Sequence, residues 1–290
     1  MVPPAIPPPL PGRSRSRLWL SLALVAGVVF LAAVIGAGVV SFQRVKQRAV
    51  AQRQALKELN KSADEIRART AQDIKEGRTE NTDASLGQLR DVLGKTASQL
   101  RGPDADAARA MGNFLGRLQE QMRDYNAAAG RFSDANVFTF DLPDRTTIEP
   151  QRVIVRDFLA SNAQLTDLMT HSIEKVRAEL EAAKVPAAIR ESTLAGFNRS
   201  QAALRPLQLQ IRRCDETLGN SALEALDLLD KNWGKWQRDP ATTQLRFQDD
   251  TTLATYNALM IKVQETAAEQ AQAQQEMAAK MQSQQSTKTP

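Results

Sequence analysis

The sequence has few of the residues on which most catalytic and metal sites depend. It contains one cysteine, Cys214, and one histidine, His171, in 290 residues. A single cysteine excludes an intramolecular disulfide, and a single histidine excludes an HExxH zinc site and makes any Ser or Cys triad depend on His171. We therefore predict no catalytic residues, no metal site and no cofactor. We interpret Cys214 as a packing residue and His171 as a core or solvent-edge residue.

Aromatic residues and glycine are also scarce. Phe, Trp and Tyr make up 5% of the chain, and glycine occurs 14 times. Long stretches consist instead of Ala, Gln, Leu, Glu, Arg and Lys, which are residues of high helix propensity. This composition predicts an all-α protein.

The charges are nearly balanced, with 38 Lys and Arg against 33 Asp and Glu. No basic stripe is interleaved with aromatic residues, which is the pattern expected of a nucleic-acid interface. We therefore predict that nucleic acid is not a partner.

One long run lacks charge altogether, the 25 residues from Leu18 to Phe42. As a helix it would be about 37 Å long, more than the ~30 Å hydrocarbon core of a bilayer. A secretory signal has an apolar region of only about 7–15 residues, so an uncleaved anchor is favoured over a signal cleaved near "GAGVVS". Basic residues bracket the run, as at two membrane–water interfaces: Arg13, Arg15, Arg17, Arg44, Lys46 and Arg48.

The flanking charges give conflicting indications of orientation. The C-terminal flank carries more Lys and Arg, which by the positive-inside rule favours a cytoplasmic bundle. Moving a short arginine-rich tail across a membrane is unfavourable, however, while long C-terminal domains translocate largely regardless of charge. We predict a single-pass protein of the bacterial inner membrane, with a cytoplasmic N-terminal tail and an extracytoplasmic C-terminal domain. The lipid bilayer is then its first partner.

Small residues spaced four apart within the run allow two helix backbones to approach closely. Self-association through the membrane and the ordinary composition of a spanning helix both explain them. They are Ala23, Gly27, Ala32, Ala33, Gly36 and Ala37.

The rest of the chain shows helical periodicity in successive segments. We expect an elongated bundle of about four or five amphipathic helices. The predicted divisions are a Pro/Arg-rich disordered tail (1–17), the transmembrane helix (18–42), a juxtamembrane helix or stalk (43–78), the bundle (79–264) and a Gln/Ala-rich C-terminal tail (265–290) that frays.

Several local signals refine the bundle. Pro103 and Asp104 suit a helix start, and Asn162 lies on the buried seam of a near-heptad helix over residues 155–180. Pro206 either starts or kinks the next helix. Asp250 is placed to cap the last helix, after a short extended piece near Leu245–Phe247.

The stretch "LDLLDKNWGKWQRDPATTQLRFQDDTTLATYNALM" combines a helix, a short extended piece and then Tyr256, Asn257 and Leu259. It resembles the C-terminal part of a family of bacterial envelope lipoproteins of unknown function with mostly helical domains. The chain departs from that family because it has an uncleaved span and no lipoprotein cysteine near it. The resemblance implies a location in the bacterial envelope and no activity.

Three classes of function follow from these features. The first is an envelope structural or protein-interaction module whose bundle binds a partner protein or a second copy of itself. The second is an extracytoplasmic, sensor-like bundle that binds a ligand and acts through a separate transducer. The third is an enzyme, which would need several carboxylates buried together inside the bundle. The first class is preferred.

Overall fold

The computed structural model describes residues 82–239 and 244–286, together with a few positions between 58 and 72. The predicted transmembrane helix, its six flanking charges and its small residues lie outside the described residues. Within the described residues, no helix is long and apolar enough to cross a membrane. The transmembrane assignment therefore stays a prediction.

Helices dominate the described part, so the all-α prediction is confirmed. They are α4 (Thr82–Gln99), α5 (Pro103–Asp134), α6 (Ile148–Thr170), α7 (Ser172–Ala182), α8 (Ala187–Gln201), α9 (Arg205–Lys231) and α10 (Asp250–Ser286). The other elements are the 3₁₀ turns η1 (Val137–Thr139) and η2 (Arg145–Thr147) and the strands β1 (Trp236–Arg238) and β2 (Leu245–Phe247).

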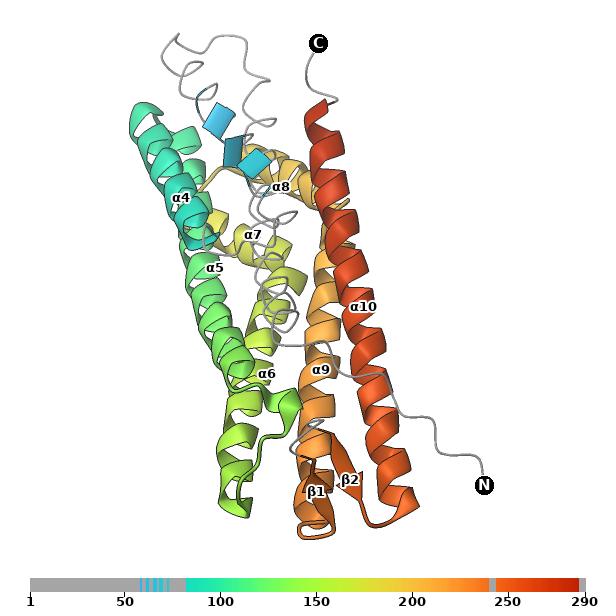
Figure 1. The fold of residues 1–290 in the computed structure, drawn as a ribbon. Coiled ribbons are helices and arrows are strands. Elements are labelled where there is room, and N and C mark those ends of the chain that lie inside the picture. The colour runs from blue at the N-terminus through green and yellow to red at the C-terminus, as the bar shows by residue number, and fades with distance from the viewer. Residues whose placement is uncertain are drawn as a thin grey trace.

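The longest helices run side by side and make the bundle elongated (Figure 1). α5, α9 and α10 have 32, 27 and 37 residues, which corresponds to about 48, 40 and 55 Å. α6 packs against both α5 and α9, α4 packs along α5, and α10 packs along α9. α4 and α10 therefore lie at opposite edges of the bundle (Figure 1).

The helix starts follow from local chemistry. Pro103 and Pro206 lie in the first turns of α5 and α9, where the missing N–H costs little. Pro206 therefore starts its helix and does not kink it. The side chain of Asp249 accepts a hydrogen bond from the Thr252 backbone N–H at 2.7 Å, so the cap of α10 is one residue earlier than the predicted Asp250.

A small antiparallel ribbon joins α9 to α10. β1 pairs with β2 in the register Trp236 to Phe247. The predicted extended piece at Leu245–Phe247 is confirmed as β2, and β1 was not predicted. α9 ends at Lys231, so Trp236 belongs to the ribbon, where its indole N–H donates to the Leu229 carbonyl at 2.9 Å.

The main core lies between α5, α6 and α9 and extends to the first half of α10. Phe132 stacks on Phe158 with their ring centroids 4.7 Å apart. Other fully buried members are Phe114, Leu118, Leu165, Leu226 and Val263.

A second, smaller apolar cluster lies apart from the main core, where the beginning of α9 meets the end of α10. Leu204, the residue immediately before α9, joins Leu207 and Ile211 of α9, and α10 contributes Ala273, Met277, Ala278 and Met281. We call this set the second cluster.

The second cluster corrects one predicted boundary. The Gln/Ala-rich composition predicts fraying from residue 265, but α10 continues as a helix to Ser286. Its apolar face is made of Ala and Met rather than Leu, and the start of α9 offers an apolar stripe that covers such small side chains. The bundle therefore extends well past residue 264.

The number of helices also differs from the prediction. Seven α-helices are described, against the expected four or five. The seam predicted over residues 155–180 is divided at His171, whose backbone leaves helical geometry at φ −101° and ψ 25°. Because of this division, α6 packs against α5 and α9, whereas α7 packs against α5 and α8.

Candidate functional site

Polar side chains meet inside the bundle between the two apolar clusters. On α9, Arg212 and Asp215 lie between Ile211 of the second cluster and the main core, and on α10, Gln270 lies between Val263 and Ala273. Tyr125 of α5 and Asn162 of α6 complete the set. We call Tyr125, Asn162, Arg212, Asp215 and Gln270 the polar layer; all five residues are buried.

The spacing on α9 brings the two charges together. Residues three apart share a helix face, and an Nη2 atom of Arg212 lies 2.9 Å from Oδ2 of Asp215. The exposed fractions of the two side chains are only 0% and 2%. This pair is therefore withdrawn from water, unlike the ion pairs on the bundle surface.

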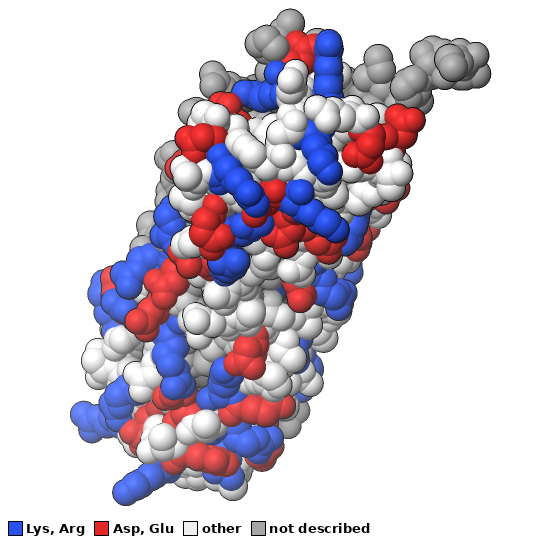
Figure 2. All heavy atoms as spheres, turned by 90° about the horizontal axis from the view of Figure 1, so that it is seen from below, with Lys and Arg blue, Asp and Glu red and all other residues white. Residues whose placement is uncertain are grey.

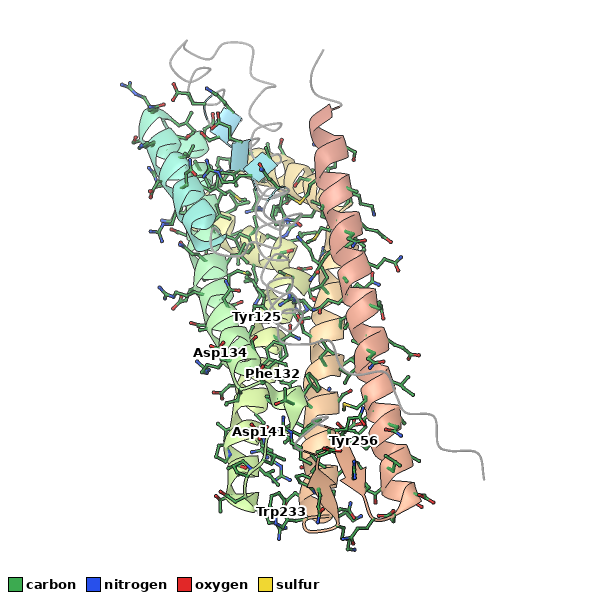
Figure 3. The ribbon with its side chains drawn as sticks, in the orientation of Figure 1. Tyr125, Phe132, Asp134, Asp141, Trp233 and Tyr256 are labelled. Atoms are coloured by element: carbon green, nitrogen blue, oxygen red, sulfur yellow. The ribbon has the colours of Figure 1, made fainter. Side chains whose placement is uncertain are left out.

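The Asp215 carboxylate joins three helices. The Tyr125 hydroxyl donates to Oδ2 at 3.0 Å, and the Gln270 amide Nε2 donates to Oδ1 at 2.6 Å. Together with Arg212, these donors satisfy both carboxylate oxygens. One acceptor thus binds α5, α9 and α10 to each other; Tyr125 is labelled in Figure 3.

Two further contacts position Arg212. Its guanidinium carbon lies 4.2 Å from the centroid of the Tyr125 ring, a distance at which a cation is attracted to an aromatic face. The Asn162 side-chain amide donates to the Arg212 backbone carbonyl at 2.9 Å, which connects α6 to the layer. The prediction that Asn162 lies on a buried seam is confirmed by its exposed fraction of 3%.

Burial dominates the electrostatics of the layer. Loss of solvation raises the pKa of Asp215, and the charge of Arg212 and the hydrogen bonds from Tyr125 and Gln270 oppose that rise. Loss of solvation also raises the pKa of the Tyr125 hydroxyl far above its ordinary value. The hydroxyl therefore keeps its proton and remains a donor.

A second charged group ties α6 to the far end of α9. Arg152 lies 2.7 Å from Asp227 Oδ1 and 2.9 Å from Asp230 Oδ2, and Arg145 lies 2.6 Å from Asp230 Oδ1. The hydrogen bonds from Arg145 and Arg152 hold the pKa of Asp230 below its ordinary value. Viewed from below, basic and acidic side chains are interspersed rather than separated (Figure 2).

Aromatic rings gather around the connector between α5 and α6. The Phe140 ring packs against Tyr256 at a centroid distance of 5.8 Å, and Tyr256 packs against Phe247 at 5.2 Å. Arg238 of β1 pairs with Asp141 of the connector at 2.8 Å. The rings and the ion pair hold the connector against the ribbon and α10. Asp141 and Tyr256 are labelled in Figure 3.

The single cysteine and the single histidine lie in different environments. Cys214 is a free, buried thiol, and burial raises its pKa to about 12. His171 is exposed, with its Nδ1 2.8 Å from an oxygen of Asp167, which also pairs with Lys175. Within the residues that the structure describes, no three His, Cys, Asp or Glu side chains are grouped as metal ligands.

A hollow of about 320 Å³ lies between α4 and the described positions near residue 60. Its charged lining carries both signs, with Glu58, Lys61, Glu65 and Lys95. It lies away from the polar layer.

The polar layer was missed from the sequence, except for Asn162. Arg212 and Asp215 flank Cys214, which was interpreted from the sequence as a packing residue. Their three-residue spacing within an apolar face was the available signal. Gln270 fell within the segment expected to fray.

Comparison with models of protein families, with curated proteins and with solved structures finds no match to this chain.

Proposed function

We propose that this protein is a membrane-anchored helical bundle that serves as an envelope structural or protein-interaction module. The predicted helix Leu18–Phe42 would anchor it, and the elongated bundle would present a long surface beyond the membrane. The bilayer is its first partner, and an envelope protein or a second copy of the chain is the second. The resemblance of residues 226–260 to envelope lipoproteins of helical fold favours the same location.

The bonding within the polar layer is the observation that carries this proposal. The one buried carboxylate of the layer, Asp215, receives hydrogen bonds from α5 and α10 and pairs with Arg212 on α9. These groups are used to join helices, as in bundles where buried polar residues specify how helices pair. Such an interior supports a structural or binding role.

Topology is tested first by thiol labelling in intact cells. Cys214 is buried with a raised pKa, so the wild-type protein serves as the unlabelled control. An Ala178→Cys variant places a thiol on the exposed face of α7. Labelling of this variant by a membrane-impermeant reagent before lysis is the expected result. Labelling only after lysis would place the bundle in the cytoplasm and overturn the envelope proposal.

A second test addresses association. A photo-crosslinking residue at the exposed Ala160 of α6 should yield a discrete product in membranes, either with a second copy or with one envelope protein. The same residue at the buried Ala129 of α5 is the matched control and should yield none. A monomeric bundle without crosslinks from any exposed face would refute the interaction role.

The hollow near residue 60 supports one alternative, a sensor-like bundle that binds a small polar ligand and acts through a separate transducer. Lysines and glutamates line it together, which suits a ligand that carries both charges. Native mass spectrometry of the purified chain would then show a bound small molecule, which a Lys95→Met variant should lose. Retention of the same mass by the variant would exclude this hollow as the site.

A further inference from the structure

The two halves of α10 are held in different ways. In the first half, Met260 and Val263 enter the main core and Tyr256 packs against Phe140 and Phe247. The second half, residues 266–286, contributes only alanine and methionine to the second cluster. We call this second half the strap.

The strap covers an apolar stripe at the start of α9. Leu204, Leu207 and Ile211 form this stripe, which we call the seat. Among the described residues, the seat is packed mainly by Ala273, Met277, Ala278 and Met281 of the strap. Alanine buries little area and methionine is flexible, so the strap is held by smaller or more adaptable side chains than α5, α6 and α9, which bury phenylalanine and leucine in the main core.

Part of the covered face of the strap is polar. Thr266, Gln270 and Gln274 are buried along with its alanines and methionines. Gln270 donates to Asp215 at 2.6 Å, and at the edge Gln210 donates to Glu269 at 2.9 Å. The bond from Gln270 is the buried one, and it connects the strap to the polar layer.

We propose that the strap is a reversible cover of the seat, latched by the hydrogen bond from Gln270 to Asp215. It leaves the seat as one unit while α5, α6 and α9 stay folded, because regions with few buried apolar contacts open first. Once released it frays, since most of the stability of a helix in a protein comes from the packing of its apolar face. The uncovered seat then binds an amphipathic helix with the chemistry of the strap: small residues, methionine and a glutamine at the latch position.

This inference rests on the proposed interaction function, because it names the surface that would receive a helix. The strap closes that surface in the resting chain. The helix-in-groove mode of recognition fits a stripe of three aliphatic side chains on one helix face.

Hydrogen exchange of the full-length protein tests the cover. Amides of residues 267–286 should exchange faster than those in the middle of α5 and α9. A Gln270→Ala variant should accelerate exchange in the strap by about tenfold to a hundredfold, the effect of removing one hydrogen bond to a charged group. A Gln275→Ala variant, which alters an exposed glutamine of the same helix, should change nothing.

Two exchange results would overturn the proposal. One is protection of the strap equal to that of α9 in the wild-type protein. The other is equal acceleration of α5, α9 and the strap in the Gln270→Ala variant, since the strap would then open only with the whole bundle.

A peptide of residues 263–286 with a fluorescent label tests the seat directly. It should bind the full-length Gln270→Ala variant more tightly than the wild-type protein, because the weakened strap competes less for the seat. Equal or absent binding to both proteins would show that the seat does not accept a helix in trans. Neither measurement depends on topology, so failure of the strap is distinguishable from failure of the envelope proposal.

Discussion

Replacement of Arg212 by methionine perturbs the polar layer at its most buried charge. The substitution retains much of the volume but removes the partner that lies 2.9 Å from Asp215 and the cation that lies 4.2 Å from the Tyr125 ring. Asp215 would remain as a buried carboxylate that accepts hydrogen bonds from Tyr125 and Gln270 but has lost its cationic partner. Breaking such a pair typically costs about 3–5 kcal/mol in the free energy of unfolding.

The matched control removes both charges of the layer together with the Tyr125 hydroxyl. In a Tyr125→Phe/Arg212→Met/Asp215→Leu variant no charge is left buried in the polar layer, and replacing a buried pair by apolar residues is often neutral or stabilising by about 1–4 kcal/mol. The Gln270 amide loses its acceptor in this variant, at a cost of about 1–3 kcal/mol. The two effects offset each other, so the triple variant should lie within about 2 kcal/mol of the wild-type protein.

Urea denaturation of the full-length protein, followed by far-ultraviolet circular dichroism, measures both quantities. The slope of the free energy against urea should stay constant, which shows that the same surface is exposed on unfolding. A single variant that costs less than about 1 kcal/mol, far below a typical broken buried pair, would refute the reasoning. So would a triple variant that costs as much as the single one, because the penalty would then come from lost volume rather than from the stranded charge.

Three further predictions concern packing, reactivity and pH. A Cβ added at Gly219 would lie 2.6 Å from Cδ2 of Leu159, so Gly219→Ala should lower the free energy of unfolding by about 1–3 kcal/mol in the same denaturation assay. A Cβ added at Gly116 meets open space, so Gly116→Ala should raise the free energy of unfolding by up to about 1 kcal/mol. Equal effects of the two substitutions would contradict the close contact between α6 and α9 at Gly219. Cys214, with its pKa raised to about 12, should react with a chromogenic disulfide reagent at pH 8 only after unfolding, and rapid reaction of the native protein would show that α9 is exposed there. Hydrogen bonds from Arg145 and Arg152 hold the pKa of Asp230 below its ordinary value, so the stabilising contribution of its ion pairs is present above that ordinary value and is lost as the pH falls through the lower folded-state value. Thermal melting of Asp230→Asn should accordingly depend less on pH than that of the wild-type protein between about pH 5 and 2. An unchanged slope would show that the ion pairs do not stabilise the fold.

Local signals predicted the elements whose causes are local. Pro103 lies at a first turn whatever packs nearby, because a proline N–H is missing in any context. The alternation through Leu245 and Phe247 identified β2 because such a pattern is likewise a property of the local sequence. Asn162 could be placed on a buried seam because the heptad spacing around it is regular.

Tertiary contacts decided the elements that local signals misplaced. The strap has the composition of a fraying tail, yet α9 supplies an apolar stripe that covers its alanines and methionines. The division at His171 separates two helices that share α5 as a neighbour but differ in the other one, since α6 packs against α9 and α7 packs against α8. No periodicity within residues 155–180 reports on those neighbours.

The helical class, the starts of several helices and the candidate anchor follow from the amino-acid sequence alone, because propensity, proline chemistry and an uncharged run of 25 residues act without distant partners. The candidate site, in contrast, depends on the packing of helices that are distant in the sequence. Tyr125 and Asp215 are 90 residues apart in the chain, and Asp215 and Gln270 are 55 apart. Their hydrogen bonds depend on how three helices pack, and burial of that meeting point is what turns an ordinary Arg–Asp pair into a structural joint.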